Sequence, residues 1–331
     1  MNRLKDFWHK LARKKGWHSL QQHIWQSGHC YGCGACVIVC PMGCLEFKDP
    51  EGSTPALTGE CKNYFSCEAV CPALHPRNQR LDLAEVWAAK ALDRTLKGQD
   101  GSATTAILTV LLESGEIDAV IHTRLSEGYQ PIAQLSREPW EVAQGSRSAY
   151  TFVSLASAIR TALIDEQLTV AVVGMPCVIS GLANIRRYHP RIFRNRLKLA
   201  VSLFCTEIFQ RKPFLEIGSR GKSQSISKIE IRRQATFFGD STSWTLPTKT
   251  LRPAIRSGCR FCRDLISPDA DLGMGAVDSA IDETTIVTFT AAGQAALRLA
   301  KDSLSLRRLE GPFPHITRLA KKKKKRKHPL G

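Results

Sequence analysis

Four cysteines near one end of the chain have the spacing of iron–sulfur ligands. They form the run C-x2-C-x2-C-x3-C, which Pro41 closes, and are Cys30, Cys33, Cys36 and Cys40. Two-residue gaps let successive thiolates converge on one [4Fe–4S] cube, and the fourth thiolate reaches another cube. Gly32 and Gly34 permit the tight winding that this requires. Because zinc rarely uses three consecutive short gaps, we favour a cluster over a zinc knuckle or a disulfide framework, and expect the protein to move electrons.

A second, incomplete run follows the first. Cys61, Cys67 and Cys71 take its first, third and fourth positions, Pro72 closes it, and Tyr64 stands where the second cysteine belongs. The two runs together predict a segment like a two-cluster bacterial ferredoxin.

The crossed ligand pattern of such ferredoxins leaves the second site incomplete. It assigns the first cube four thiolates, those of Cys30, Cys33, Cys36 and Cys71. It assigns the second site three, those of Cys40, Cys61 and Cys67. Either this site is a three-iron [3Fe–4S] cluster, or Cys44 completes it, or the second cluster has been lost. A Cys44 that is only a small buried hydrophobe is an equally good interpretation.

The remaining four cysteines are scattered along the second half of the chain: Cys177, Cys205, Cys259 and Cys262. Four is the number that a cluster needs, and the C-x2-C pair is a chelating unit. Single cysteines at strand ends are often inert, but the arrangement of the others favours a third cluster. Twelve cysteines without an export signal indicate a reducing cytosol and not a disulfide framework.

Length and composition indicate about two domains with ample core, since the chain has 331 residues, of which 43% are hydrophobic. No apolar run reaches the roughly 18 residues that cross a bilayer. The net charge of +17 is concentrated in residues 1–16 and in the run Lys321–Lys327. Apolar residues at helical spacing in the first segment predict an interfacial or docking helix. The lysine run predicts a disordered tail, which is merely solvated or attaches to an anionic membrane surface or acidic protein; nucleic acid is not favoured.

Between these ends, helical and β-branched segments alternate, which predicts an α/β layer structure. We expect strands at 117–124, 169–174, 198–205, 226–233 and 284–290, and helices at 102–114, 152–166, 178–187 and 292–302. Residues 81–96 are expected to form a helical connector. Three loops carry glycine with hydroxyl groups or follow a buried strand, where phosphates and other ligands bind: Gly98–Thr105, Gly145–Thr151 and Gly174–Cys177.

These loops belong to a set of motifs that resembles the family of coenzyme F420 hydrogenase/dehydrogenase beta subunits. The motifs, from about Gly98 to Thr290, are GQDGSATTAI, EIDAVI, GSRSAYT, VAVVGMPCVISGL, LFCTEIF and CRFCRDLISPDADLGMG. The preceding iron–sulfur segment is similar to that of the electron-input subunit of F420H2 dehydrogenase. The resemblance implies an α/β flavin-binding domain (mixed sheet with flanking helices) preceded by an α+β bacterial-ferredoxin-like iron–sulfur domain.

The resemblance also implies cofactors and their residues. The four scattered cysteines match the cluster beside an FAD, and the loops match flavin-lining segments: Gly98, Gln99, Asp100, Gly101, Ser102, Thr105, Gly145, Ser146, Tyr150, Thr151, Gly174, Met175 and Pro176. No catalytic acid–base pair is identified. The expected divisions are a basic leader (1–28), the ferredoxin-like domain (29–76), a connector (77–97), the flavin domain (98–310) and a basic tail (311–331).

The expected function is that of an F420-dependent oxidoreductase subunit in the cytoplasm, possessing two or three clusters. It oxidises reduced F420 by hydride transfer to FAD and passes single electrons to ferredoxin or another redox subunit, or runs in reverse. The chain departs from the family pattern after Gly275 and near Phe237–Phe238, at segments that bear on the deazaflavin pocket. Two alternatives therefore stand: a cluster-carrying electron-transfer subunit without a hydride-donor site, and a reductase of a different organic substrate.

Overall fold

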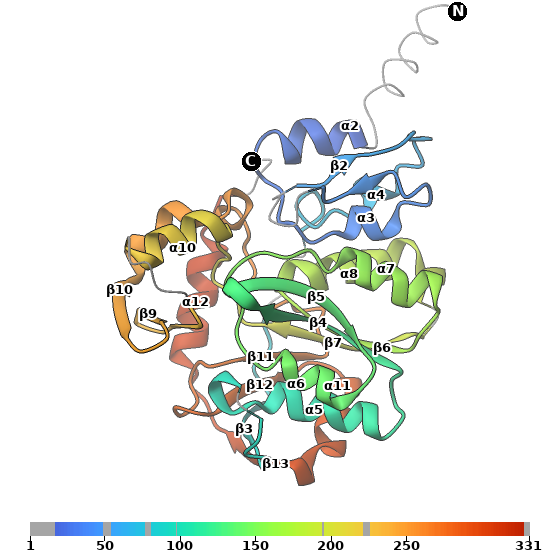
Figure 1. Cartoon of the computed structure of the whole chain (residues 1–331). Coiled ribbons are helices and arrows are strands. Elements are labelled where there is room, and N and C mark those ends of the chain that lie inside the picture. Colours follow the sequence, from blue (N-terminus) through green and yellow to red (C-terminus); the bar gives the residue numbers. More distant parts are fainter. Residues whose placement is uncertain are drawn as a thin grey trace, which may run out of the picture.

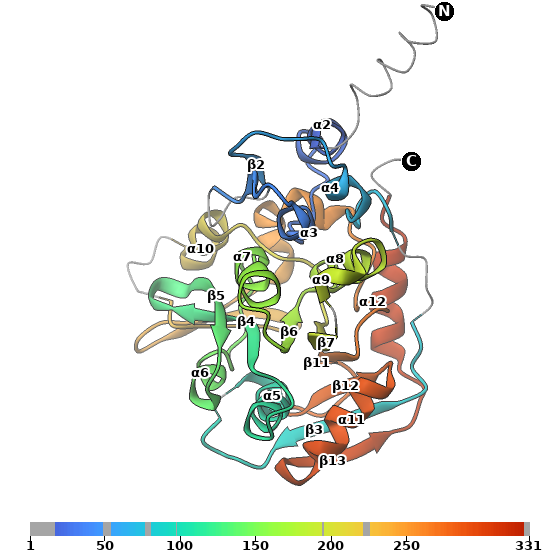
Figure 2. The ribbon, with the colours of Figure 1, turned by 90° about the vertical axis from the view of Figure 1, so that its right-hand side faces the viewer.

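The protein is built on a mixed sheet of eight strands. The computed structural model describes residues 17–48, 54–76, 81–96, 98–193, 195–220 and 226–327. The strand order is β13-β3-β12-β11-β7-β6-β4-β5 (Figures 1 and 2). Their bounds are β3 (Val86–Ala91), β4 (Ala119–Ser126), β5 (Gln130–Ser136), β6 (Val170–Gly174), β7 (Leu197–Leu203), β11 (Leu272–Gly275), β12 (Thr284–Thr288) and β13 (Leu304–Leu309).

The middle of the sheet is parallel. β11, β7, β6 and β4 pair in parallel, with Val172 of β6 opposite Ala200 of β7. β12 is antiparallel to both β11 and β3, so β3 points in the same direction as these four strands. The carboxyl ends of five strands therefore lie along one edge, where open α/β sheets bind ligands.

Both faces of the sheet are covered by helices, as alternation along the strands requires. Ile121 and Val172 point into one apolar cluster, while Val120 and Ala171 point into another. The first face packs against α7 (Ala156–Arg160), its π-helical continuation Thr161–Asp165, α8 (Pro176–Tyr188) and α9 (Pro190–Phe193); the second packs against α5 (Ala103–Glu113), α6 (Pro139–Gln144) and α11 (Ala291–Leu299) (Figure 1). The predicted strands and helices in this region are thus confirmed as elements.

The cysteine-rich segment lies on top of α7 and α8 (Figure 1). Its elements are α2 (Trp17–Leu20), the π-helical turn Gln21–Trp25, α3 (Ala35–Val39), β1 (Leu45–Glu46), β2 (Ala56–Leu57) and α4 (Ser66–Ala69). Arg160 of α7 donates hydrogen bonds to the carbonyls of Ile38 (3.2 Å) and Cys40 (3.0 Å), and Asn184 of α8 donates to that of Val70 (3.3 Å). The segment and the sheet body therefore share one apolar cluster and one polar interface.

A small antiparallel sheet stands beside the main one. It consists of β8 (Lys228–Ile231), β9 (Gln234–Phe238) and β10 (Ser243–Pro247), and it packs with α10 (Arg211–Ser219). Phe214 and Phe237 are fully buried between them. This unit borders the edge at which β4 ends, since Tyr129 belongs to the same apolar cluster.

Two expectations from the sequence were wrong. Residues 81–96 do not form a helical connector: they contain β3, which pairs with both β12 and β13 inside the main sheet. The lysine run is not disordered, because Lys321–Lys324 form the last turn of α12 (Pro314–Lys324), which packs on the body (Figure 2). The expected interfacial helix falls in residues 1–16, outside the described ranges, and the domain bounds stay predictions. No helix among the described residues is long and apolar enough to cross a bilayer.

Candidate iron–sulfur centres and cofactor edge

The first set of cysteines gathers around the start of α3. Gly32 and Gly34 adopt left-handed backbone (φ 76° for both), which turns the chain between successive cysteines. Burial raises the pKa of Cys36, and its neighbours raise it further: Cys33, Cys30 and Cys71. The structure thus brings together the four thiols that the crossed pattern assigns to the first cube.

The second set contains four cysteines, and Cys44 is one of them. Its Sγ lies 3.4 Å from that of Cys40. Burial raises the pKa of Cys44 to about 12, with contributions from Cys40 and Cys61. Cys67 lies by Cys61 and Cys40 as well, and its pKa is raised to about 11 mainly by burial. The Tyr64 side chain is exposed (61%), so a thiol, and not the phenol, is the fourth group of this set.

The third set forms where three loops meet. Cys177 opens α8, Cys205 follows β7, and Cys259 and Cys262 lie in and after the 3-10 turn Ser257–Arg260. Burial raises the pKa of Cys177, and its neighbours Cys262, Cys33, Cys205 and Cys259 raise it further. The scattered cysteines therefore come together, as the sequence predicted for a third cluster.

The three sets are adjacent in the order third, first, second. Cys33 of the first set is a neighbour of Cys177 in the third, and Cys30 is a neighbour of Cys259. On the other side, Cys67 of the second set is a neighbour of Cys36. The residues fit a line of three clusters. Within the described ranges no three His, Cys, Asp or Glu side chains converge on a single-ion position, but a cube binds its thiolates to different irons and needs no such convergence.

Two of the predicted cofactor loops touch each other at the carboxyl edge of the sheet. The Gln99 amide hydrogen-bonds the Tyr150 hydroxyl (3.2 Å), and a Cβ on Gly98 would lie 2.8 Å from the carbonyl oxygen of Ser146. Ser102 Oγ accepts from the Gly98 N–H (2.8 Å) and holds the loop in front of α5. These contacts join segments that lie almost fifty residues apart.

The third predicted loop lies beside the third cysteine set. Met175 packs against an apolar cluster that contains Phe152 and Cys259. Thr151, just before Phe152, is buried, and its hydroxyl has no hydrogen-bond partner in the described part of the chain. An orphaned buried hydroxyl fits a ligand group at this position. Thr105, by contrast, is buried within α5, and Asp100 is ion-paired with Arg232.

Comparison with known proteins gives this arrangement a family. Residues 86–160 and 168–310 match the two parts of one family model, "Coenzyme F420 hydrogenase/dehydrogenase, beta subunit", N-terminal and C-terminal, and residues 23–46 match a 4Fe-4S binding domain. The two parts together cover more than half of the chain. The chain belongs to the family of coenzyme F420 hydrogenase/dehydrogenase beta subunits.

Relatives of this beta-subunit homologue span different contexts. It is 30% identical to the coenzyme F420-dependent sulfite reductase of Methanocaldococcus jannaschii, over 82% of this chain but only 46% of that protein. It is 26% identical to a subunit of the F(420)H(2) dehydrogenase of Methanosarcina mazei, covering 88% of this chain and 87% of the relative. A chain in the structure of the F420-reducing [NiFe] hydrogenase complex from Methanosarcina barkeri has the same fold (TM-score 0.68, 23% identity, covering 74% of this chain and 89% of that chain).

Sequence reasoning missed the cations around the third set. Arg256 is buried (1% exposed), lies over the Phe152 ring (3.8 Å to the centroid) and donates to the Tyr31 carbonyl (3.0 Å). Lys323 is buried although it sits in the lysine run. Burial alone would lower its pKa, but Cys262 and the other nearby thiols raise it above the ordinary value. A run of identical lysines gives no signal as to which one is buried.

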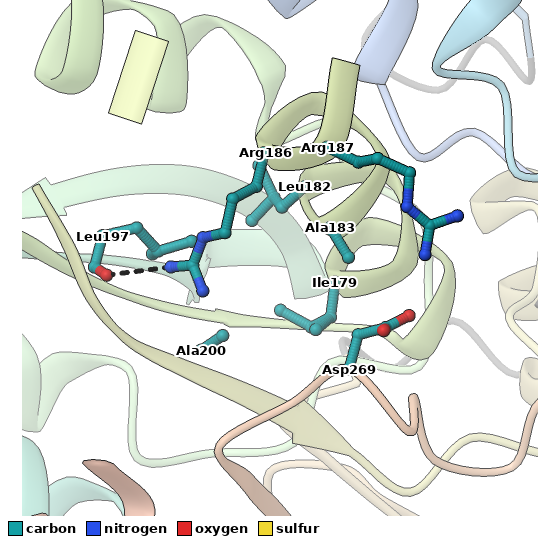
Figure 3. Close-up of a pocket in the computed structure, with 8 residues that line it drawn as sticks. All are labelled: Ile179, Leu182, Ala183, Arg186, Arg187, Leu197, Ala200 and Asp269. Atoms are coloured by element: carbon teal, nitrogen blue, oxygen red, sulfur yellow. Dashed lines mark hydrogen bonds between the residues drawn. The ribbon is translucent and has the colours of Figure 1, made fainter. Parts of the chain in front are cut away.

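Glu207, which the sequence suggested either for a flavin edge or for the surface, is ion-paired with Arg326 at 3.1 Å. Its carboxylate therefore belongs to the surroundings of the third cysteine set. None of the predicted loop residues lines the cavity of about 240 Å³ drawn in Figure 3, which lies between α8 and β7. Arg186 crosses it to the Leu197 carbonyl (3.1 Å), and Asp269 lies at its other side.

Proposed function

We propose that the chain is an iron–sulfur flavoprotein that exchanges a hydride with coenzyme F420 and passes single electrons to a protein partner. The observation that carries the proposal is the unbroken neighbourhood of the three cysteine sets, which begins at the carboxyl edge of the sheet and ends at exposed Tyr64. Family membership supports the hydride donor, and the 4Fe-4S domain match supports the electron line.

A flavin at the carboxyl edge would connect the two kinds of chemistry. When bound, FAD accepts a hydride, two electrons together, and releases electrons singly to a cluster. The chain's own part is to hold it between the loops 98–102, 145–151 and 174–176. The start of α5 offers unpaired backbone N–H groups for a phosphate, and the buried Thr151 hydroxyl offers a further polar partner. Met175 would place the flavin next to the third cysteine set.

The partner would be ferredoxin or another redox subunit that meets the second set. Met42, Tyr64 and Phe65 expose large apolar side chains around it, a composition that favours protein contact. In the relatives' names, subunits of dehydrogenase and hydrogenase complexes support a role inside a larger assembly. We place the chain in the cytoplasm, in line with its twelve unpaired cysteines.

Peripheral membrane attachment is retained in a narrower form than the lysine run suggested. Four lysines of the run remain exposed and available to an anionic surface: Lys321, Lys322, Lys325 and Lys327. Lys323 is not available, because it is buried against the body.

The test is anaerobic purification with quantitation of iron, sulfide and flavin, followed by an assay for oxidation of reduced F420 with a one-electron acceptor. We expect about twelve irons and one FAD per chain, and bleaching of the flavin by reduced F420. Clusters without flavin would replace the proposal by a cluster-carrying subunit. Flavin that reduced F420 does not bleach would replace it by a reductase of another organic substrate.

A further inference from the structure

The C-terminal helix α12 is fixed to the body by specific contacts. The Asp278 carboxylate accepts hydrogen bonds from the backbone N–H groups of His315 (3.2 Å) and Ile316 (2.9 Å) in its first turn. Ile316 is fully buried. The family model ends at residue 310, before α12 begins. Asp278 itself lies in the stretch after Gly275 where the sequence departs from the family motif, so the departure coincides with the anchor of this helix.

The other end of α12 reaches the third cysteine set. The buried Lys323 ammonium donates hydrogen bonds to the Cys205 carbonyl (3.0 Å) and to Cys262 Sγ (3.6 Å). Arg326 donates to the carbonyls of Cys259 (2.5 Å) and Cys262 (3.3 Å). Three of the four cysteines in the set thus hold a cation of this segment through their sulfur or carbonyl.

We propose that α12 is a cationic cap of the third cluster, in which Lys323 is a positioning residue that stabilises the reduced form and Arg326 secures the cap. The inference rests on the proposed function, because it requires a cluster on Cys177, Cys205, Cys259 and Cys262. It assigns the end of the lysine run to electron transfer inside the chain and not to the surface.

Charge is the physical reason. Reduction adds one electron to the cluster and hence one negative charge, and net charge, hydrogen bonds to the sulfurs and solvent exposure set cluster potentials. A buried cation acts through a low effective dielectric, so its attraction for that charge is much larger than that of an exposed lysine. Carboxylates lie near as well, but Glu207 is already ion-paired with Arg326. Lys323 is therefore the cation that acts most directly on the thiolate of Cys262.

The experiment is a potentiometric titration of the full-length holoprotein, followed by EPR, on Lys323→Met and on three comparison variants. At the wild-type midpoint, Lys323→Met should have a reduced-to-oxidised ratio for the third cluster at least tenfold lower, which is 59 mV for one electron. Lys323→Arg should restore the ratio to within about twofold. Lys322→Met, an exposed neighbour in the same helix, should leave it unchanged. An intact third cluster with an unmoved midpoint in Lys323→Met overturns the proposal, even if the helix is destabilised.

Iron counts separate this inference from the proposed function. If Cys262→Ser removes no iron from the wild type, there is no third cluster and the proposed electron line fails together with the cap. If Lys323→Met itself purifies without the third cluster, Arg326→Gln decides by the same titration, because it contacts backbone carbonyls and leaves Glu207 unpaired. A lower midpoint in Arg326→Gln supports the cap, and an unchanged one overturns it.

Discussion

The Sγ atoms of Cys40 and Cys44 lie 3.4 Å apart, at the same place where Cys61 and Cys67 meet. The Tyr64 phenol, which occupies the regular ligand position in the sequence, is directed to solvent, with 61% of the residue exposed. The spare thiol of the first run therefore stands in for the cysteine that the second run lacks.

Removing that thiol should convert the second cluster. We expect Cys44→Ser to give a three-iron EPR signal in the oxidised protein, because the remaining three thiolates cannot retain the labile iron. EPR and iron analysis of the anaerobically purified variant measure the change, which should be about one iron per chain.

The matched variant at the regular position is Tyr64→Cys. It should leave the EPR spectra unchanged, since the side chain at 64 is exposed and the set is already complete. A three-iron signal already present in the wild type, and converted to a four-iron signal by Tyr64→Cys, would show that Cys44 is not a ligand.

Replacing Cys259 or Cys262 by serine should remove about four irons per chain and leave the signals of the first two clusters. The reason is that both thiols are buried in the third set, which is built from elements other than the ferredoxin-like segment. Iron analysis and EPR of the two variants check this. The same iron count in both variants and in the wild type would refute a third cluster.

A methyl group on Gly98 should disturb the flavin and spare the iron. In Gly98→Ala the new Cβ would lie 2.5 Å from Ser102 Oγ and 2.8 Å from the Ser146 carbonyl, so the two loops must separate. We expect at least tenfold weaker FAD binding by fluorescence titration. The iron content serves as internal control, and FAD binding equal to the wild type would argue that these loops do not hold the cofactor.

His122 should make the protein acid-sensitive. It is buried with Nε2 2.8 Å from Ser136 Oγ, and burial lowers its pKa from 6.5 to about 4. The unfolded chain therefore binds a proton near pH 6.5 that the folded chain refuses until about pH 4, so stability falls as the pH falls through this window.

His122→Gln retains a hydrogen-bonding group but no titration. Relative to this variant, wild type should lose on the order of 2 kcal/mol of unfolding free energy between pH 7 and pH 5. Anaerobic thermal unfolding of both proteins across this range measures the difference. Parallel curves for the two proteins would contradict the assignment.

The exposed part of the lysine run should determine any binding to anionic membranes. Neutralising Lys321, Lys322, Lys325 and Lys327 as glutamines should lower sedimentation with anionic vesicles, because each cation contributes about 1 kcal/mol near such a surface. Glutamines at four exposed cations elsewhere, Lys249, Arg252, Arg298 and Lys301, are the matched control. Equal sedimentation of all three proteins would exclude a membrane role for the run.

Spacing alone predicted the cysteine partners of the first site, because cluster geometry restricts the gaps between ligands. The parallel strands were predictable for a similar reason: β6 and β7 are short runs rich in Val and Leu that are buried on both faces. Cys44 could not be chosen over Tyr64, because the choice depends on how β1 and β2 fold back over the site.

Other features depend on contacts between distant residues. Alanine-rich β3 has helical propensity, and its strand form comes from pairing with β12 and β13, about 200 residues away. The burial of Lys323 depends on the rotation of α12, which Asp278 fixes from another loop. Neither relationship leaves a local pattern in the sequence.

The contact between the first cysteine run and the third set has a consequence for protein engineering. Gly258 passes so close to Cys30 that a Cβ on it would lie 1.9 Å from the Cys30 carbonyl oxygen, and Arg256 holds the neighbouring Tyr31 carbonyl. The cysteine-rich segment is therefore not a transferable cassette, although it looks like one in the sequence. A chimaera that exchanges it between homologous chains must exchange residues 256–258 with it, or the graft will lack one wall of its first cluster site.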